Sequence, residues 1–369
     1  MNDLDLKFLK MTIPLAKKGL GRVSPNPLVG SVIVKSGKII STGYHKYCGG
    51  DHAEINAIKK AKQSLRGAML YVNLEPCVHF GHTPPCSDAI IKAGIKRVVI
   101  GHRDPNPIIR GKGIRKLVKA GVLVEICEQA QAFEDLNEIF IKYITLKTPF
   151  VCVKTGQSLD GKIAASSGQS KWITSKASRN RAQYLRKKYD CIMVGINTIL
   201  KDNPYLSCRY RNKLEPDIPI KLIIDSQLRT PFNANIFSKL SPAPVMIATT
   251  KAASLEKISQ FNNMGVDILI CPHGKTKKVD LKYLMNQLYK HEISSVLVEG
   301  GAQINGACFD DKIADKISFF TAPKIIGGEN AINSIGGEGI SNLQKAVIID
   351  KIKITKLDKD LLIEGKVKY

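Results

Sequence analysis

One histidine, one glutamate and two cysteines in the first hundred residues have the types and order of a catalytic zinc site. His52 and Glu54 stand two residues apart, and Cys77 and Cys86 follow them. Zinc held by three nitrogen and sulfur ligands keeps a fourth position open for water, whose pKa then falls towards neutrality. A carboxylate two residues after the histidine can lie near that water without binding the metal, and can pass its proton to a leaving amine. The pattern predicts zinc chemistry on these four residues.

The order His-x-Glu followed by Pro-Cys is also the signature of zinc-dependent nucleobase deaminases. The spacing departs from that signature, because eight residues separate Cys77 from Cys86 where the general pattern has two. His79 and His82 lie in this interval and could compete as ligands, although a cysteine on each side favours substrate contacts or plain loop residues. In a structural interpretation, His52 caps a helix and both cysteines are buried thiols. The ordered set, each placed at a helix start, favours zinc.

Longer runs around these residues resemble the pyrimidine deaminases of the riboflavin pathway. The runs are Ser24–Pro27 with Val29 and Gly30, Gly49–Glu54, Leu74–Cys86 and Arg103–Pro107. That family has the longer gap between its cysteines, and usually carries Lys or Arg where this chain has His82. The resemblance implies zinc on His52, Cys77 and Cys86, with Glu54 as the catalytic proton shuttle. It also suggests ring recognition by three residues that turn chemistry in Pro-rich loops would equally explain: Asn26, Asp104 and Asn106.

The second half of the chain carries a glycine pair, Gly300-Gly301, between an apolar strand and an expected helix. Glycine there lets the backbone approach a pyrophosphate, and a helix N-terminus favours the anion. No strand is followed by G-x-G-x-x-G, so a Rossmann site is not predicted. Further segments resemble, in order, the reductase half of the bifunctional riboflavin deaminase–reductases, whose fold is similar to dihydrofolate reductase: Lys154–Ala164, Ser170–Thr174, Gly195–Pro204, Ile224–Pro231 and Glu299–Gly301.

This resemblance implies a cofactor site and a substrate site. The implied NADPH contacts are Gly156, Trp172, Thr198, Asp202, Ser226, Gly301, Ala302, Gln303, Ile304, Asn305, Gly306 and Ala307. The implied substrate contacts are Ser170, Arg186, Leu206, Arg209 and Glu299. A sugar phosphate needs cationic or amide donors, and guanidinium offers a bidentate fork, which independently supports the arginines. Gly156 departs from the family's commoner Ala. Trp172 could instead anchor a core or lid, Asp160-Gly161 fits a hairpin turn, and Lys154 could polarise a sugar carbonyl.

The elements that must position these residues alternate between short apolar strands and helices. Strand-like Leu28–Lys35 is followed by helical His52–Gln63 and Ser87–Gly94, and Gln129–Ile144 is predicted as one helix. Such alternation predicts α/β layers around a largely parallel sheet. A second α/β series follows a connector near residues 145–150. We expect a cytidine-deaminase-like α/β/α layered domain over residues 1–147 that acts as a zinc-dependent pyrimidine deaminase, and a dihydrofolate-reductase-like α/β domain over residues 148–369 that acts as an NADPH-dependent reductase.

The composition of the chain excludes several classes of protein. The 369 residues carry 56 Lys+Arg against 32 Asp+Glu, a net charge of +24, and 44% of them are hydrophobic, which excludes wholesale disorder. No stretch approaches about 18 consecutive apolar residues, so a membrane span is not expected. Nine cysteines without a signal-like N-terminus favour thiols or metal ligands in a cytoplasmic protein. The basic excess is spread along the chain without Arg/aromatic interleaving, which favours anionic small substrates over nucleic acid.

The leading hypothesis is a bifunctional enzyme for two consecutive riboflavin steps. Zinc hydroxide would deaminate 2,5-diamino-6-ribosylamino-4(3H)-pyrimidinone 5′-phosphate, and NADPH would then reduce the ribosyl group, giving 5-amino-6-(5-phosphoribitylamino)uracil. The expected partners are this phosphorylated pyrimidine and further copies of the chain in a homo-oligomer, with no nucleic acid and no membrane. One alternative is a zinc deaminase acting on bases in RNA, with a basic C-terminal binding module. Another is a structural zinc site, which would need a fourth protein ligand.

Overall fold

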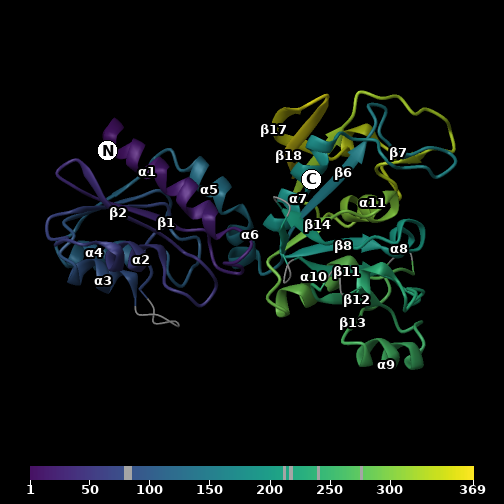
Figure 1. The fold of residues 1–369 in the computed structure, drawn as a ribbon, viewed down its shortest axis with the longest axis horizontal. Coiled ribbons are helices and arrows are strands. Elements are labelled where there is room, and N and C mark those ends of the chain that lie inside the picture. The colour runs from purple at the N-terminus through teal and green to yellow at the C-terminus, as the bar shows by residue number, and fades with distance from the viewer. Residues whose placement is uncertain (79–84, 211–212, 216–218, 239–241, 275–276) are drawn as a thin grey trace. The chain divides into compact units, whose positions relative to one another are not determined.

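Two compact units make up the chain, Met1–Lys147 and Thr148–Tyr369 (Figure 1). The computed structural model describes residues 1–78, 85–210, 213–215, 219–238, 242–274 and 277–369. Each unit consists of a main β-sheet with helices packed on it, so the predicted α/β fold class is confirmed for both halves. Within the described residues, no helix combines the length and the apolar character needed to cross a membrane.

The sheet of the first unit is mixed. Its strands are β1 (Gly30–Lys35), β2 (Lys38–Tyr44), β3 (Met69–Val72), β4 (Arg97–Ile100) and β5 (Leu123–Ile126), in the order β2-β1-β3-β4-β5. Strands β3, β4 and β5 are parallel, whereas β1 is antiparallel to both β2 and β3. The expectation of a largely parallel sheet is therefore wrong at this edge. The reason is local: Ser36 and Gly37 both have positive φ, which closes a tight β1–β2 hairpin.

Helices cover both faces of this sheet, as the layered prediction requires (Figure 1). They are α1 (Asp3–Ala16), α2 (Ala53–Lys60), α3 (Cys86–Lys92), α4 (Lys112–Lys119), α5 (Gln131–Leu136) and α6 (Glu138–Leu146). Leu9 of α1 and Phe133 of α5 are buried in one core cluster. Ala57, Ile90 and Leu117, from α2, α3 and α4, are buried in the other. The starts of α2 and α3 therefore belong to the same layer.

The single helix expected over Gln129–Ile144 is instead two helices that meet at Asn137. The backbone there leaves the helical region, with φ −111° and ψ 21°. The Asn137 side chain accepts a hydrogen bond from the backbone N–H of Leu28 at 2.8 Å and donates one to the Leu28 carbonyl at 3.1 Å. A distant backbone segment thus captures the side-chain amide, and this tertiary contact overrides the local helical pattern.

The second unit contains a nine-stranded sheet. In spatial order its strands are β13 (Asp267–Ile270), β12 (Val245–Thr249), β11 (Ile220–Ile224), β8 (Cys191–Gly195), β14 (Ser295–Val298), β6 (Phe150–Gln157), β15 (Lys316–Thr321), β18 (Asp360–Lys368) and β17 (Ile348–Leu357). Neighbours from β13 to β15 are parallel, and β18 and β17 are antiparallel additions at one edge. Two short strand pairs lie outside this sheet: β7 (Lys162–Ala164) with β16 (Ile332–Asn333), and β9 (Cys208–Tyr210) with β10 (Lys213–Glu215).

Both faces of the parallel region are buried, which explains its continuous apolar strands. The helices are α7 (Lys176–Lys188), α8 (Ile196–Asp202), α9 (Leu255–Asn263), α10 (Leu281–Lys290) and α11 (Ala302–Asp310). Along β8, Met193 packs in one cluster with Leu284 of α10, and Val194 packs in the other with Phe261 of α9. Because parallel strands end at the same edge, the carboxyl ends of β6, β8, β11 and β14 meet there. Open α/β sheets bind ligands at such an edge.

A buried ion pair ties the first helix to the sheet of the first unit. Asp5 is only 3% exposed. Its carboxylate accepts two hydrogen bonds from Arg97 of β4, each at 2.8 Å, and one from the Tyr71 hydroxyl at 2.7 Å. It also accepts the backbone N–H of Asn2, whose side chain caps α1 in return. The Arg97 guanidinium beside Asp5 holds the pKa of that carboxyl well below its usual range.

The variant Asp5→Asn should lower the free energy of unfolding of the first unit by about 3 kcal/mol at neutral pH, because it removes one partner of a buried pair. The lowered pKa of Asp5 means that its stabilisation is complete above the ordinary carboxyl pKa and is lost as the pH falls below it. The difference between variant and parent should therefore shrink below about pH 4. Unfolding followed by circular dichroism measures this. Fluorescence of Trp172, the only tryptophan, reports on the other unit and should be unchanged. A gap that is independent of pH would contradict this account.

Candidate active sites

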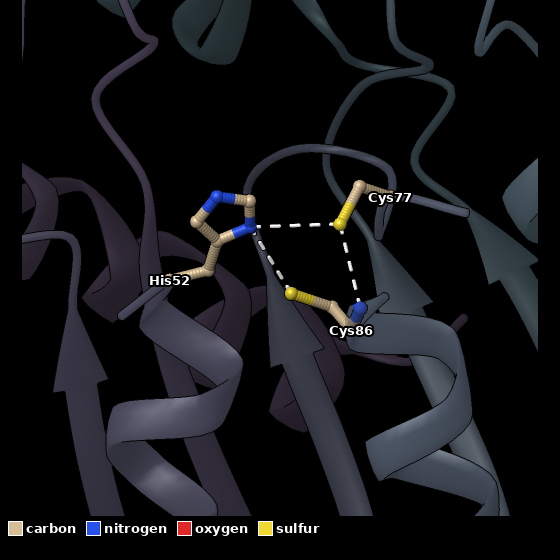
Figure 2. Close-up of side chains that lie close together, drawn as sticks. All are labelled: His52, Cys77 and Cys86. Atoms are coloured by element: carbon tan, nitrogen blue, oxygen red, sulfur yellow. Dashed lines mark hydrogen bonds between the residues drawn. The ribbon is translucent and has the colours of Figure 1, made fainter. Parts of the chain in front are cut away.

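His52, Cys77 and Cys86 converge on one point in the first unit, as Figure 2 shows. His52 Nδ1 lies 3.2 Å from Cys86 Sγ and 3.5 Å from Cys77 Sγ. All three ligand atoms lie within 4.8 Å of one another. One imidazole nitrogen and two sulfurs form a donor set that suits zinc, so the residues present fit the ion that the sequence predicts.

Two helix starts, at His52 and Cys86, and the segment after β3 that carries Cys77 bring these side chains together. The expectation that each residue of the set lies at a helix start is wrong for Cys77. His52 is the N-cap residue of α2 and both cysteines are buried, as the structural interpretation has it, but the imidazole makes no capping hydrogen bond and faces the two sulfurs instead. Cys86 is the first residue of α3, and its backbone N–H donates to Cys77 Sγ at 3.4 Å. Partial positive charge at a helix start and a backbone N–H both favour a thiolate. The local fold thus favours the form of cysteine that binds metal.

The protonation of the two cysteines is unequal. Contact with the Cys86 thiol, and hydrogen bonds from His52 and the Cys86 N–H, lower the pKa of Cys77 to about 4. Interaction with Cys77 and burial raise the pKa of Cys86. The local environment therefore favours the thiolate form at Cys77 and the thiol form at Cys86. Metal binding to such a cluster releases the second thiol proton, because zinc requires deprotonated cysteines.

Glu54 lies in the first turn of α2 and is almost fully buried, with 3% exposed. Burial raises the pKa of Glu54 to about 7. Among the residues that the structure describes, the converging set is His52, Cys77 and Cys86, and Glu54 stands outside it. A carboxyl group whose pKa is near neutral can both accept and donate a proton beside a metal-binding site.

A second histidine beside the cluster was not singled out by the sequence analysis. His45 packs edge-on against His52, with ring centroids 5.4 Å apart. Its Nδ1 lies 3.1 Å from the Asp51 carbonyl and its Nε2 lies 3.3 Å from Asn26 Nδ2. A carbonyl accepts and an amide nitrogen donates, so these contacts fit a neutral ring with its proton on Nδ1. Burial lowers the pKa of His45, which favours the same form.

The loop that starts at Asp104 is held by local turns. Asp104 is 5% exposed, and burial raises the pKa of its carboxyl to about 6. Asp104 Oδ1 accepts the backbone N–H of Asn106 at 2.8 Å, and Asn106 Oδ1 accepts that of Ile108 at 3.0 Å. The turn chemistry considered for Asn106 is therefore present. His79 and His82 lie outside the described residues.

The second unit holds a buried ionic cluster at Glu299, directly after β14. Arg186 of α7 donates two hydrogen bonds to its carboxylate, each at 2.8 Å, and Lys154 Nζ of β6 lies 3.6 Å away. Burial of Glu299 opposes ionisation, but the two cations outweigh it and lower the pKa to about 2. Glu299 is therefore an anion throughout the working pH range, and its charge is balanced within the protein.

Helix α7 organises several expected substrate contacts. Arg186 also donates to the Ser207 carbonyl at 2.8 Å, so its guanidinium fixes Glu299 in place. The side chain of Gln183 accepts the backbone N–H of Arg209, which is exposed on β9. Neighbouring Leu206 is buried, and Ser170 lies in the loop before α7.

Trp172 is 64% exposed, so the alternative of a core anchor is wrong. The Arg179 guanidinium lies over its ring, 4.4 Å from the centroid, and donates to the Thr174 carbonyl at 2.7 Å. Gly156 at the end of β6 has ordinary room for a methyl group, 3.6 Å from Thr174 Cγ2. Glycine is thus compatible with, but not required by, this position.

The expected cofactor contacts lie along the carboxyl edge of the parallel strands. Thr198 is in the first turn of α8, Ser226 follows β11, and Gly301 is the N-cap of α11. A methyl group on Gly301 would stand 4.0 Å from Thr198 Oγ1, so these two elements adjoin. Ser226 Oγ accepts the Val279 N–H at 3.1 Å, and Asp202 is exposed at the end of α8.

The later residues of the Gly301–Ala307 segment face the protein. Asn305 is 1% exposed and donates to the Ser334 carbonyl at 2.8 Å. A methyl group on Gly306 would overlap the Gly336 carbonyl. Ala302, Gln303, Ile304 and Ala307 are exposed or half-buried. The start of the segment is therefore the part open to a ligand.

Family models match both units. The model described as the cytidine and deoxycytidylate deaminase zinc-binding region covers residues 2–102, and the RibD C-terminal domain covers residues 149–363. The riboflavin biosynthesis protein RibD of Actinobacillus pleuropneumoniae is 45% identical over 365 residues, which are 99% of this chain and 95% of that protein. The chain belongs to the RibD family. The RibD of Aquifex aeolicus is 41% identical, over 98% of each chain.

Solved structures agree along the whole length. Acinetobacter baumannii RibD superposes with a TM-score of 0.87 at 32% identity, over 99% of both chains. A Thermotoga maritima protein superposes with a TM-score of 0.84 at 37% identity, again over 99% of both, and is named as a diaminohydroxyphosphoribosylaminopyrimidine deaminase and 5-amino-6-(5-phosphoribosylamino)uracil reductase. The chain is thus a bifunctional deaminase and reductase of riboflavin biosynthesis, and the RNA-deaminase alternative is not favoured.

The Arg186–Glu299 pair makes a stability prediction. Arg186→Lys keeps the charge but loses the planar fork, so Glu299 is left with weaker partners in a buried site. The free energy of unfolding of the second unit should fall by about 2 kcal/mol. Chemical denaturation followed by Trp172 fluorescence measures it, because the only tryptophan lies in this unit. Arg229→Lys, at an exposed position, is the matched control and should change nothing. Equal stability of the two variants would contradict the role of the pair.

Proposed function

We propose that the Met1–Lys147 unit deaminates 2,5-diamino-6-ribosylamino-4(3H)-pyrimidinone 5′-phosphate. We further propose that the Thr148–Tyr369 unit reduces the ribosyl group of the product with NADPH, giving 5-amino-6-(5-phosphoribitylamino)uracil. The observation that carries the proposal is the convergence of His52, Cys77 and Cys86 beside buried Glu54, in a chain whose halves match a deaminase and a reductase family. The substrate names follow the activities named for the Thermotoga protein.

In the deaminase, His52, Cys77 and Cys86 would hold zinc. Bound zinc supplies a Lewis acid that makes water nucleophilic near neutral pH. Glu54 accepts a proton from the attacking water and gives one to the amino group, which leaves as ammonia. Its buried setting keeps its pKa near the working pH, and this supports both transfers. His45 supports the geometry by packing against His52.

In the reductase, NADPH supplies the hydride. Lys154 is the second cation beside Glu299, 3.6 Å from its carboxylate, and its ammonium also lies 5.9 Å from the centroid of the Phe320 ring. It would polarise the sugar oxygen that gains a proton as the neighbouring carbon gains the hydride. Glu299, which Arg186 holds by two hydrogen bonds, keeps this ammonium in place. Arg209, exposed on β9, is available to bind the substrate phosphate as a charged fork.

The proposal places the enzyme in the cytoplasm, with a phosphorylated pyrimidine as its partner and no role for nucleic acid. It also includes a homo-oligomer. Strand β17 forms one edge of the nine-stranded sheet. Its residues Ile348, Ile352 and Ile354 are 57%, 58% and 61% exposed. An exposed apolar edge strand is a surface that another chain can cover, which supports the oligomer.

Glu54→Gln separates the two activities. Deamination should fall about a thousandfold, because the amide cannot carry the proton. Reduction of supplied deaminated substrate should persist, and zinc content should be unchanged. Absorbance of the pyrimidine and oxidation of NADPH measure the two steps. Glu128→Gln, an exposed position of the same unit, is the matched control and should behave like the parent protein.

Two outcomes of this experiment would count against the proposal. Deamination that survives in Glu54→Gln would remove Glu54 from the mechanism. Loss of both activities, with the fold and zinc intact, would show that the two sites are not independent.

A further inference from the structure

Glu75 is a buried carboxylate that none of the roles above explains. It precedes Pro76-Cys77 and is 3% exposed. Its two oxygens accept four backbone N–H groups. Oε2 accepts those of Asp104 at 3.2 Å and Gly111 at 3.0 Å, and Oε1 accepts those of Gly113 at 3.0 Å and Ile114 at 3.2 Å. One carboxylate thus holds a long loop and the start of α4.

The four contacts close the loop at its base. Asp104 and Gly111, at the two ends of the loop, share the same oxygen of Glu75. The backbone N–H of Glu75 also donates to the His102 carbonyl at 3.0 Å, just before the loop. Inside the loop, the turns at Asp104 and Asn106 wind the chain locally. Glu75 therefore connects this wound loop to the segment that carries Cys77.

Close packing reinforces the connection. A methyl group on Gly113 would overlap the Pro76 carbonyl and stand 3.2 Å from the Glu75 side chain. Gly111, the N-cap of α4, has φ 74°, a conformation that favours glycine. The first turn of α4 thus lies directly against the backbone that leads into the metal ligand. A movement of this loop is a movement relative to Cys77.

We propose that Glu75 is a positioning residue of the deaminase, which sets the Asp104–Gly111 loop against the zinc site and thereby the affinity for the pyrimidine. The inference rests on the proposed deaminase function. Four converging N–H dipoles need an acceptor at both oxygens, which a carboxylate offers and an amide does not. The four side-chain hydrogen bonds of Glu75 go to this loop and to the start of α4, whereas His52, Glu54 and Cys86 lie at the starts of α2 and α3. Loss of these bonds should therefore affect binding more than chemistry.

The test is Glu75→Gln in the full chain, which keeps the shape of the side chain but turns one acceptor into a donor. The KM of deamination should rise about tenfold. This is less than the roughly hundredfold effect that a displacement of about 1 Å can have on an enzyme. Its kcat should stay within about threefold, as expected when binding and not chemistry is lost. Zinc content and reduction of supplied deaminated substrate should be unchanged. Amide hydrogen exchange in residues 104–114 should be faster. Glu75→Asp keeps the charge, so its KM and its amide exchange should lie between those of the parent protein and of Glu75→Gln. If Glu75→Gln does not fold, the same measurements on Glu75→Asp test the inference.

Asp5→Asn is the matched control, because Asp5 is an equally buried carboxylate in another helical layer of the same unit. It should destabilise the unit without a change in KM or in loop exchange. An unchanged KM and exchange in Glu75→Gln, an equal rise of KM in Asp5→Asn, or joint loss of zinc and kcat overturns the inference. Turnover by the parent protein tests the proposed function separately, and the exchange readout decides on the loop whatever that turnover is.

Discussion

The deaminase unit depends on two helices starting at the same place. A metal site of His52, Cys77 and Cys86 exists only if α2 and α3 begin within reach of one another. The sheet enforces this for α2. The hydroxyls of Ser31 and Ser41 donate to carbonyls of α2, and a methyl group on Gly43 would overlap the Ala53 carbonyl. The helix therefore sits directly on the β1–β2 hairpin, and its start carries both a proposed zinc ligand, His52, and the proposed proton shuttle, Glu54. Burial also raises the pKa of the Glu54 carboxyl to about 7, which keeps its proton exchangeable near neutral pH.

In the reductase unit, parallel strands bring the candidate site residues together. The ends of β6, β8, β11 and β14 lie along one edge, so residues far apart in the sequence meet there without any dedicated motif. Glu299 is the charged centre of that edge. Its carboxylate is paired with the cations of Arg186 and Lys154 inside the protein. These three charged side chains therefore hold one another in place without a ligand. In both units, the charged side chains of the site lie at the start of a helix or the end of a strand: Glu54 at the start of α2, and Glu299 directly after β14.

The sequence predicted features that depend on neighbouring residues, and it missed contacts between residues far apart along the chain. His52, Glu54, Cys77 and Cys86 were found because type, order and helix starts are all readable along the chain. The break at Asn137 was missed because its cause is the backbone of Leu28, a partner 109 residues away. The four donors that Glu75 binds are 29 to 39 residues away, and no local pattern announces them. The contact of His45 with His52 arises where β2 ends beside α2, which a linear spacing does not show.

The most direct test of this account is X-ray absorption at the zinc edge on the full-length protein. The account predicts a first shell of two sulfurs at about 2.3 Å and one imidazole nitrogen, with the remaining position taken by a light atom from solvent. Addition of a transition-state analogue of the hydrated pyrimidine should alter only that last position. A shell closed by four protein ligands, or one without both sulfurs, would contradict the central claim that this cluster is an open, catalytic metal site.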